Sequence, residues 1–129
     1  VAILFNDISA RKAVEKGADG LIAVAAGAGG HAGTLSPLAL ISELREWFDG
    51  PLALSGAIGN GHSILAAQAM GADLAYAGSA FIATKEAPVH ENVKKALVAA
   101  RARPSTAPNW TKAVVMVLVM MAPLDGSRL

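Results

Sequence analysis

Short apolar runs alternate along this chain with segments whose apolar residues fall at helical spacing. A continuous apolar run of about four or five residues is typical of a strand buried on both faces of a sheet. The intervening segments predict helices, each ended by a glycine or a proline. Strands are expected near residues 1–5, 21–25, 52–55 and 74–77, and helices over residues 10–16, from Ser36 to before Gly50, over 63–70 and over 89–103. Asn6, Asp7 and Ser9 are candidate caps of the first helix.

This order of elements predicts an α/β fold in which parallel strands alternate with helices. The helices are expected to pack on one outer side of the sheet. An internal repeat agrees with a fold built from like units, because Gly17-Ala18-Asp19 and Gly71-Ala72-Asp73 each stand between a predicted helix and a predicted strand. The pattern gives no placement for the apolar stretch 114–121.

Composition narrows the class of protein. The 129 residues are 53% hydrophobic and carry a formal net charge of +1, which excludes a disordered chain and gives no basis for nucleic-acid binding. The absence of cysteine excludes a disulfide scaffold and thiolate metal sites. The apolar run 113–122 is about half the ~20 residues that a spanning helix needs, and no signal-peptide pattern is visible. We therefore expect a cytoplasmic protein with no membrane span.

Glycine follows three of the four predicted strands. The stretches are 27–33, Ser55-Gly56-Ala57 and Ala77-Gly78-Ser79. Ligands of parallel α/β folds bind where strands end at their carboxyl side, and small residues there leave backbone N–H groups open to an anion. The alternative is that these are only tight turns between strand and helix. Their occurrence at consecutive strands favours a phosphate-bearing ligand.

His31 is the candidate catalytic residue of the glycine loop. Histidine titrates near neutrality, so it suits proton transfer or anion stabilisation beside a ligand. The loop can be fitted to a dinucleotide fingerprint, but the next helix begins only near Ser36, too late for that motif. His62 and His90 have the context of surface residues, and no spacing of histidine or acidic residues predicts a metal site.

Three stretches together resemble a known family. They are GADGLIAVAAGAGGHAG, PLALSGAIGNG and GADLAYAGSAFIATKEA, and they resemble the carboxyl-terminal half of the nitronate monooxygenase (2-nitropropane dioxygenase) family. Members are FMN-dependent TIM-barrel enzymes that oxidise alkyl nitronates with dioxygen, and FMN-dependent enoyl reductases are related to them. The resemblance covers roughly residues 1–90.

The resemblance implies roles for particular residues. The histidine of the GGH motif is His31, which acts as a base or anion stabiliser, and the flavin lies against Gly29 and Gly30. The remaining contacts, with the FMN phosphate, are implied for Ser55, Gly56, Ala57, Ala77, Gly78 and Ser79. The implied substrates are an alkyl nitronate or nitroalkane together with dioxygen, and no metal is implied.

The departures from the family concern both ends of the chain. Four strands cannot close a barrel that needs eight, so residues 1–88 are expected to form half of an FMN-binding TIM barrel. Residues 89–129 do not match what usually follows the last strand of the family. The alternatives are a piece of a longer enzyme that supplies the amino-terminal half, a homo-oligomer, a non-catalytic remnant, and a different phosphate-binding barrel.

Overall fold

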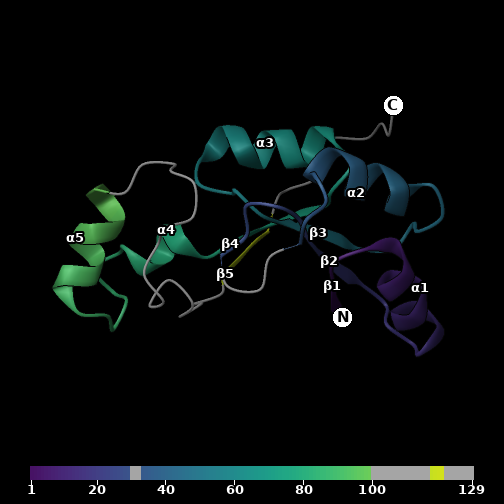
Figure 1. The fold of residues 1–129 in the computed structure, drawn as a ribbon, viewed down its shortest axis with the longest axis horizontal. Coiled ribbons are helices and arrows are strands. Elements are labelled where there is room, and N and C mark those ends of the chain that lie inside the picture. Colours follow the sequence, from purple (N-terminus) through teal and green to yellow (C-terminus); the bar gives the residue numbers. More distant parts are fainter. Residues whose placement is uncertain (30–32, 100–116, 121–129) are drawn as a thin grey trace.

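A parallel sheet of four strands forms the centre of the molecule (Figure 1). The structure is a computed structural model that describes residues 1–29 and 33–99, and the backbone of 117–120. Neighbouring strands pair in parallel in the order β1-β2-β3-β4, which confirms the predicted α/β fold with its four strands. Their bounds are β1 Ala2–Leu4, β2 Leu21–Val24, β3 Leu52–Ser55 and β4 Leu74–Ala77.

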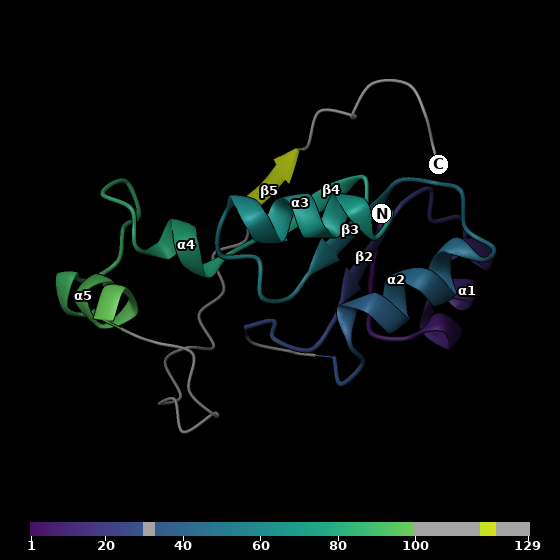
Figure 2. The same ribbon diagram turned by 90° about the horizontal axis from the view of Figure 1, so that it is seen from above.

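One face of this sheet is covered by three helices, α1 (Asp7–Glu15), α2 (Pro37–Arg45) and α3 (Gly61–Ala69). Figure 2 shows α2 and α3 lying along the strands on the same side. Because side chains alternate across a strand, every second residue faces these helices. The core between sheet and helices includes Leu4, Leu21, Ala23, Leu52 and Leu54 from the strands and Ala10, Leu40, Ile41, Leu44 and Ala67 from the helices.

Side-chain caps explain why two helices begin earlier than the sequence pattern predicts. The side chain of Asn6 accepts from the N–H of Ser9, and that of Asn60 accepts from the N–H of Ser63. Ser63 in turn accepts from the N–H of Asn60, which completes a capping box. Asn6 is thus the observed cap among the three candidates for the first helix, whereas the predicted start of the third helix at Ser63 was two residues late, because Asn60 satisfies the first free N–H groups of that helix.

The repeated Gly-Ala-Asp triplet ends two of these helices in the same way. Gly17 and Gly71 have φ of 90° and 103°, a conformation that glycine adopts readily. At each site the N–H of the following alanine reaches back across the last helical turn, from Ala18 to Ala13 O and from Ala72 to Ala67 O. This is the Schellman arrangement, so the repeat encodes a helix end followed by a strand.

Beyond β4 the chain leaves the sheet and then returns to it. A short helix, α4 (Ser79–Ile82), follows β4 directly, and α5 (Glu91–Ala99) stands apart from the sheet beside α4 (Figure 1). The predicted helix over 89–103 is thus described from 91 to 99, and residues 100–103 lie outside the described residues. The unplaced stretch contains β5 (Val117–Met120), which pairs antiparallel with β4. No helix in the described part of the chain is long and apolar enough to cross a bilayer.

The amino ends of the strands are fastened by one arginine. Arg45, at the end of α2, donates to the carbonyl oxygens of Phe48, Gly50 and Gly71 at 2.8–2.9 Å. Its remaining nitrogen lies 2.6 Å from Asp73 Oδ2, which also accepts from the N–H of Leu52. Arg45 and Asp73 therefore join the segments that lead into β3 and β4.

Candidate phosphate site at the carboxyl ends of the strands

The loop that follows β2 is held at both of its ends. Gly33 passes so close to Val24 that a Cβ atom at Gly33 would overlap the Val24 carbonyl oxygen. The N–H of Ala26 donates to Leu35 O at 2.8 Å, which folds the far end of the loop back onto the strand. Both ends of the glycine loop are therefore fixed at the carboxyl end of β2. Gly30 and His31 lie between them, outside the described residues.

The turn after β3 packs its backbone against this loop. Gly56 has φ of 129°, and a Cβ there would stand 2.9 Å from the carbonyl oxygen of Ala26. Ala57 also has positive φ, at 56°, and its N–H donates to Gly27 O at 3.0 Å. Positive φ is uncommon for alanine and is maintained only where the surroundings fix it. The turn after β3 is thus held against the loop after β2.

The turn after β4 comes close to the same loop. A Cβ built on Gly29 would have the Ser79 hydroxyl as its nearest neighbour, at 3.9 Å. Gly78 precedes α4, and Ser79 is the first residue of that helix, where N–H groups have no partner within the helix. The three loops that the sequence singled out therefore meet at one edge of the sheet. Residues far apart in the sequence, such as Gly29 and Ser79, become neighbours there.

The donor set suits a phosphate group. Ser55 and Ser79 offer hydroxyls, Ser79 and Gly78 bring the start of α4, and glycine or alanine occupies the positions between. Among the described residues of 26–29, 55–58 and 77–80 there is no acidic side chain that would repel an anion. A Cβ atom on Gly29 would have only the Ser79 hydroxyl within 4 Å, at 3.9 Å. The lack of a side chain at Gly29 therefore leaves space for a ligand there. Ala57 was expected to contact the FMN phosphate, but its N–H already donates to the Gly27 carbonyl oxygen and so positions the turn.

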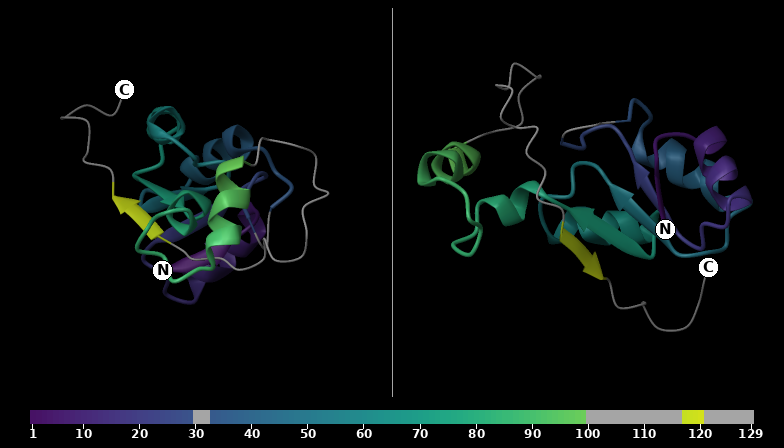
Figure 3. Two further views of the ribbon diagram at one scale, coloured as in Figure 1. Left: turned by 90° about the vertical axis from the view of Figure 1, so that its left-hand side faces the viewer. Right: turned by 90° about the horizontal axis from the view of Figure 1, so that it is seen from below.

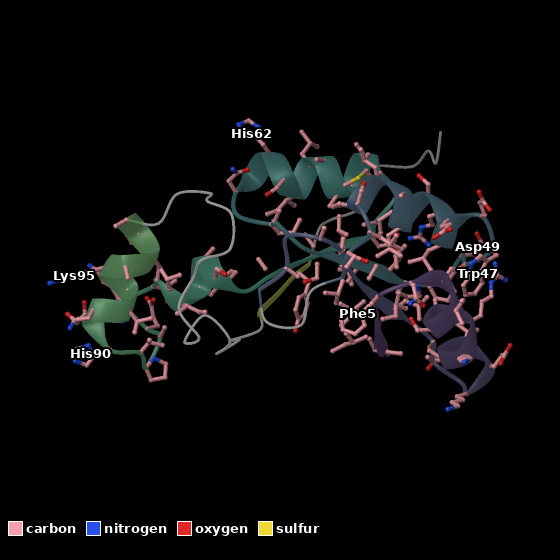
Figure 4. The ribbon with its side chains drawn as sticks, in the orientation of Figure 1. Phe5, Trp47, Asp49, His62, His90 and Lys95 are labelled. Atoms are coloured by element: carbon pink, nitrogen blue, oxygen red, sulfur yellow. The ribbon has the colours of Figure 1, made fainter. Side chains whose placement is uncertain are left out.

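Two of the three histidines lie away from this edge. His62 projects from the surface of α3, and His90 precedes α5, with its Nδ1 accepting from the N–H of Asn92 (Figure 4). Both are exposed, as expected for surface residues. No group of three metal-binding side chains occurs in the described part of the chain. A cavity of about 430 Å³ lies between α5 and the segment that follows α4, lined by Lys85, Lys94 and Lys95 among others, and none of its lining residues belongs to the glycine turns.

Tyr76 is a neighbour of the candidate site that the sequence pattern did not indicate. It is opposite Ser55 in the β3–β4 register, on the sheet face that carries no helix. Burial raises the pKa of its hydroxyl above the usual value, so this group is a neutral donor at physiological pH. Tyr76 lies within the apolar run LAYA, and the pattern of apolar residues in a strand does not indicate which of them lies beside a ligand.

Comparison with known proteins shows the family of this chain. A family model described as nitronate monooxygenase matches residues 7–105. The chain belongs to the nitronate monooxygenase family. A nitronate monooxygenase of Paraburkholderia phytofirmans is 34% identical over 99 residues, which are 70% of this chain and 27% of that protein.

Two solved structures share the fold of this family member. Nitroalkane oxidase from Streptomyces ansochromogenes superposes with a TM-score of 0.67 at 35% identity, over 73% of this chain and 30% of that one. FabK from Thermotoga maritima superposes with a TM-score of 0.76 at 28% identity, over 94% of this chain and 39% of that one. The chain spans about a quarter of the length of the curated relatives it matches.

Proposed function

We propose that this chain carries the phosphate-binding side of an FMN-dependent oxidoreductase that acts on alkyl nitronates with dioxygen. The observation that carries the proposal is the meeting of the turns after β2, β3 and β4 at one edge of the sheet, in a member of the nitronate monooxygenase family. The carboxyl edge of a parallel sheet is where such folds bind ligands. The names of the relatives, a nitronate monooxygenase and a nitroalkane oxidase, support this chemistry.

Under this proposal the turns after β3 and β4 hold the phosphate. Gly56, Gly78 and Ser79 present N–H groups, Ser55 and Ser79 present hydroxyls, and Ala77 ends the strand that positions the second turn. Hydrogen bonds from fixed N–H and hydroxyl groups to an anion are stronger than those between neutral groups. The rigid packing of Gly56 on Ala26 keeps these donors in place before the ligand arrives.

The glycine loop would serve the reacting end of the ligand. Gly29 and Gly30 let the backbone pass close to the flavin, and His31 stands in the same loop as the group that binds a nitronate anion or takes a carbon-bound proton from a nitroalkane. A bound flavin would supply the redox chemistry between the substrate and dioxygen. The part of this chain is to orient the substrate and to handle its proton.

Flavin retention tests the phosphate site directly. Protein loaded with FMN is compared with its Gly78→Val variant, which places a branched side chain beside the proposed phosphate. We expect Gly78→Val to lose the bound FMN, measured by absorbance and by mass spectrometry of the ligand released on denaturation. Ala39→Val, which places the same branched side chain at an exposed position of α2, is the matched control and should retain FMN.

The alternatives predict other results of the same measurement. A different phosphate-bearing ligand released from the purified protein would favour another barrel enzyme. A chain that takes up no flavin under any condition would favour a non-catalytic remnant. Retention of FMN by a folded Gly78→Val variant would place the phosphate elsewhere.

A further inference from the structure

The cavity beside α5 is bounded on one side by a single face of that helix. Its lining residues there follow the i, i+3, i+4, i+7 spacing of one helix face. They are Glu91, Lys94, Lys95, Val98 and Ala99. Ala83 and Lys85, from the segment that follows α4, line the other side. Figure 3 shows α5 apart from the sheet, with α4 between α5 and β4.

Burial along this face is the reverse of what a packed helix shows. Lys94 is only 9% exposed, whereas Val98, one turn further along, is 77% exposed. An amphipathic helix ordinarily buries its apolar residues and leaves its lysines in water. Burial of an ammonium group is costly unless the group is well paired and hydrogen-bonded. A buried lysine beside an exposed valine therefore fits a face that receives a ligand better than one that only packs.

The ammonium group of Lys94 is only partly paired. Its Nζ donates to the carbonyl oxygen of Lys85 at 3.2 Å and lies 3.4 Å from Glu91 Oε1. The Glu91 side chain is mostly exposed, so water weakens this ion pair. Because an ammonium group has three N–H donors, these two contacts leave one donor for an acceptor in the cavity.

The charges around the cavity are mainly positive. Its three lysines are accompanied by the single carboxylate of Glu91, which gives the lining a formal charge of +2. Among the described residues, neither Lys85 nor Lys95 has an ion-pair partner. Glu86 is not a lining residue, and the first acidic residue after Glu91 in the sequence is Asp125. The counter-charge that this cavity lacks is therefore expected from a ligand.

We propose that this cavity binds a small organic anion, a carboxylate or phosphate group carried on a short apolar chain. The volume of about 430 Å³ lies in the range of small-molecule sites and far exceeds the space that one water needs. Lys85 and Lys94 bind the anionic group as point charges. Ala83, Val98 and Ala99 contact the apolar chain, and Val98 is covered when the ligand binds. Figure 4 shows Lys95 on the outer side of α5, at the rim.

The cavity is distinct from the candidate flavin site. Ser79, the first residue of α4, belongs to the candidate phosphate site, whereas Ala83 follows the last residue of that helix. The two sites share no residue. The inference does not rest on the flavin proposal, and its failure would leave that proposal unaffected.

A set of matched probes tests the site in the full chain. Hexanoate and hexyl phosphate carry both the charge and the apolar chain, 1-hexanol carries the chain alone, and inorganic phosphate carries the charge alone. Titrations followed by ¹H–¹⁵N NMR should show saturable shifts of the Ala83, Lys85 and Val98 amides with at least one of the two organic anions. The alcohol and inorganic phosphate should bind about tenfold more weakly or less, because each lacks half of the contacts.

Variants of the lining locate the charge that binds the anion. Lys94→Met and Lys85→Met should each weaken binding of the organic anion by about tenfold, the usual effect of a hydrogen bond to a charged group. Lys12→Met, at an exposed position of α1, makes the same change of charge and should leave binding unchanged. Glu91→Gln should strengthen binding a few-fold, because it frees Lys94 and removes a negative charge from the lining.

The alternative is that Lys94 only fastens α5 to the segment after α4, through its hydrogen bond to Lys85 O. That role predicts a loss of stability in Lys94→Met and no effect of Lys85→Met or Glu91→Gln on any ligand. Binding that both of these variants leave unchanged would therefore overturn the proposal.

The probes give two further ways to overturn it. Absence of saturable binding for both organic anions does so directly. Equal binding of 1-hexanol does so as well, because the cavity would then take up apolar molecules regardless of charge. If Lys94→Met does not fold, as judged by far-UV circular dichroism, the exposed positions Lys85 and Glu91 decide the question.

Discussion

The two ends of the parallel strands are built by different means. At the amino ends a long charged side chain, Arg45, binds three carbonyl oxygens and Asp73. At the carboxyl ends the backbone itself packs, as where Gly56 meets Ala26 and Ala57 donates to Gly27. In the first arrangement the polar groups bind one another and stabilise the fold. Under the proposed function, the hydroxyls and N–H groups of the second arrangement bind the ligand, so substitutions at the two ends should have separable effects.

The largest effect is expected for His31, which belongs to the glycine loop between Gly27 and Gly33 in the sequence. In FMN-loaded protein, His31→Ala should retain FMN and reduce turnover of neutral nitroalkanes by ~10²–10⁴-fold, the usual contribution of a general base. Turnover of pre-formed nitronates should fall less if His31 is mainly a base, and equally if it mainly binds the anion. Steady-state kinetics with both substrates measures this. Activities within a few-fold of the parent on both would make His31 a bystander.

Arg45 should show the opposite behaviour at the amino ends. Arg45→Ala leaves three carbonyl oxygens and Asp73 without their partner, and we expect a loss of about 3 kcal/mol in the free energy of unfolding. Arg45→Lys retains the charge but not the planar fork, so it should recover only a small part of this loss. Urea denaturation measures both. FMN affinity should remain unchanged below the unfolding transition, and a specific loss of flavin would contradict the separation of the two ends.

A pair of glycine substitutions compares the two ends directly. Gly56 and Gly17 both have positive φ, but a Cβ at Gly17 meets nothing within 4 Å, whereas one at Gly56 meets Ala26 O at 2.9 Å. Gly17→Ala should cost about 1 kcal/mol of stability from backbone strain alone, and Gly56→Ala about 2 kcal/mol. Only Gly56→Ala should also weaken FMN binding, measured by fluorescence titration. Equal flavin affinities would show that the turn after β3 does not hold the phosphate.

The smallest effect belongs to a surface cluster where α1 begins. Asp7 lies 2.7 Å from Arg11 Nε and accepts from Trp47 Nε1 at 2.6 Å. The Arg11 hydrogen bond, aided by that from Trp47, holds the pKa of Asp7 below its ordinary value. The stabilisation is therefore complete above the unfolded pKa, near 3.9, and is lost as the pH falls through the lower folded value.

The Asp7→Asn variant tests the direction of this pH dependence of stability. At pH 7 it should lose less than about 1 kcal/mol, as is usual for exposed ion pairs, and the difference from the parent should shrink as the pH falls below about 4. Glu43→Gln, an exposed residue of α2, makes the same change of charge and is the control. Thermal unfolding across this pH range measures the difference. A gap that widens on acidification would mean that Asp7 is not stabilised as an anion.

Local patterns in the sequence were enough to predict most of the parallel sheet. Leu52-Ala53-Leu54 is a continuous apolar run because both faces of β3 are buried, and the predicted strand matches the observed one. Asn6 was among the candidate caps of the first helix and is the observed one, whereas the cap at Asn60 was missed, because a polar residue before a helix has the same pattern as a loop until its hydrogen bonds are seen. α4 was missed because four residues are too few to show a helical period.

The glycine positions and the hydroxyls of the candidate site were determined by the sequence itself, because only residues without bulky side chains leave a backbone open to an anion. Which of them meet was decided by the tertiary structure. Gly29 lies near Ser79, and Gly56 near Ala26, so residues 30 to 50 positions apart in the sequence are brought together where the parallel strands end. The pairing of β5 with β4 likewise has no local signature, because an edge is defined only once the rest of the sheet exists.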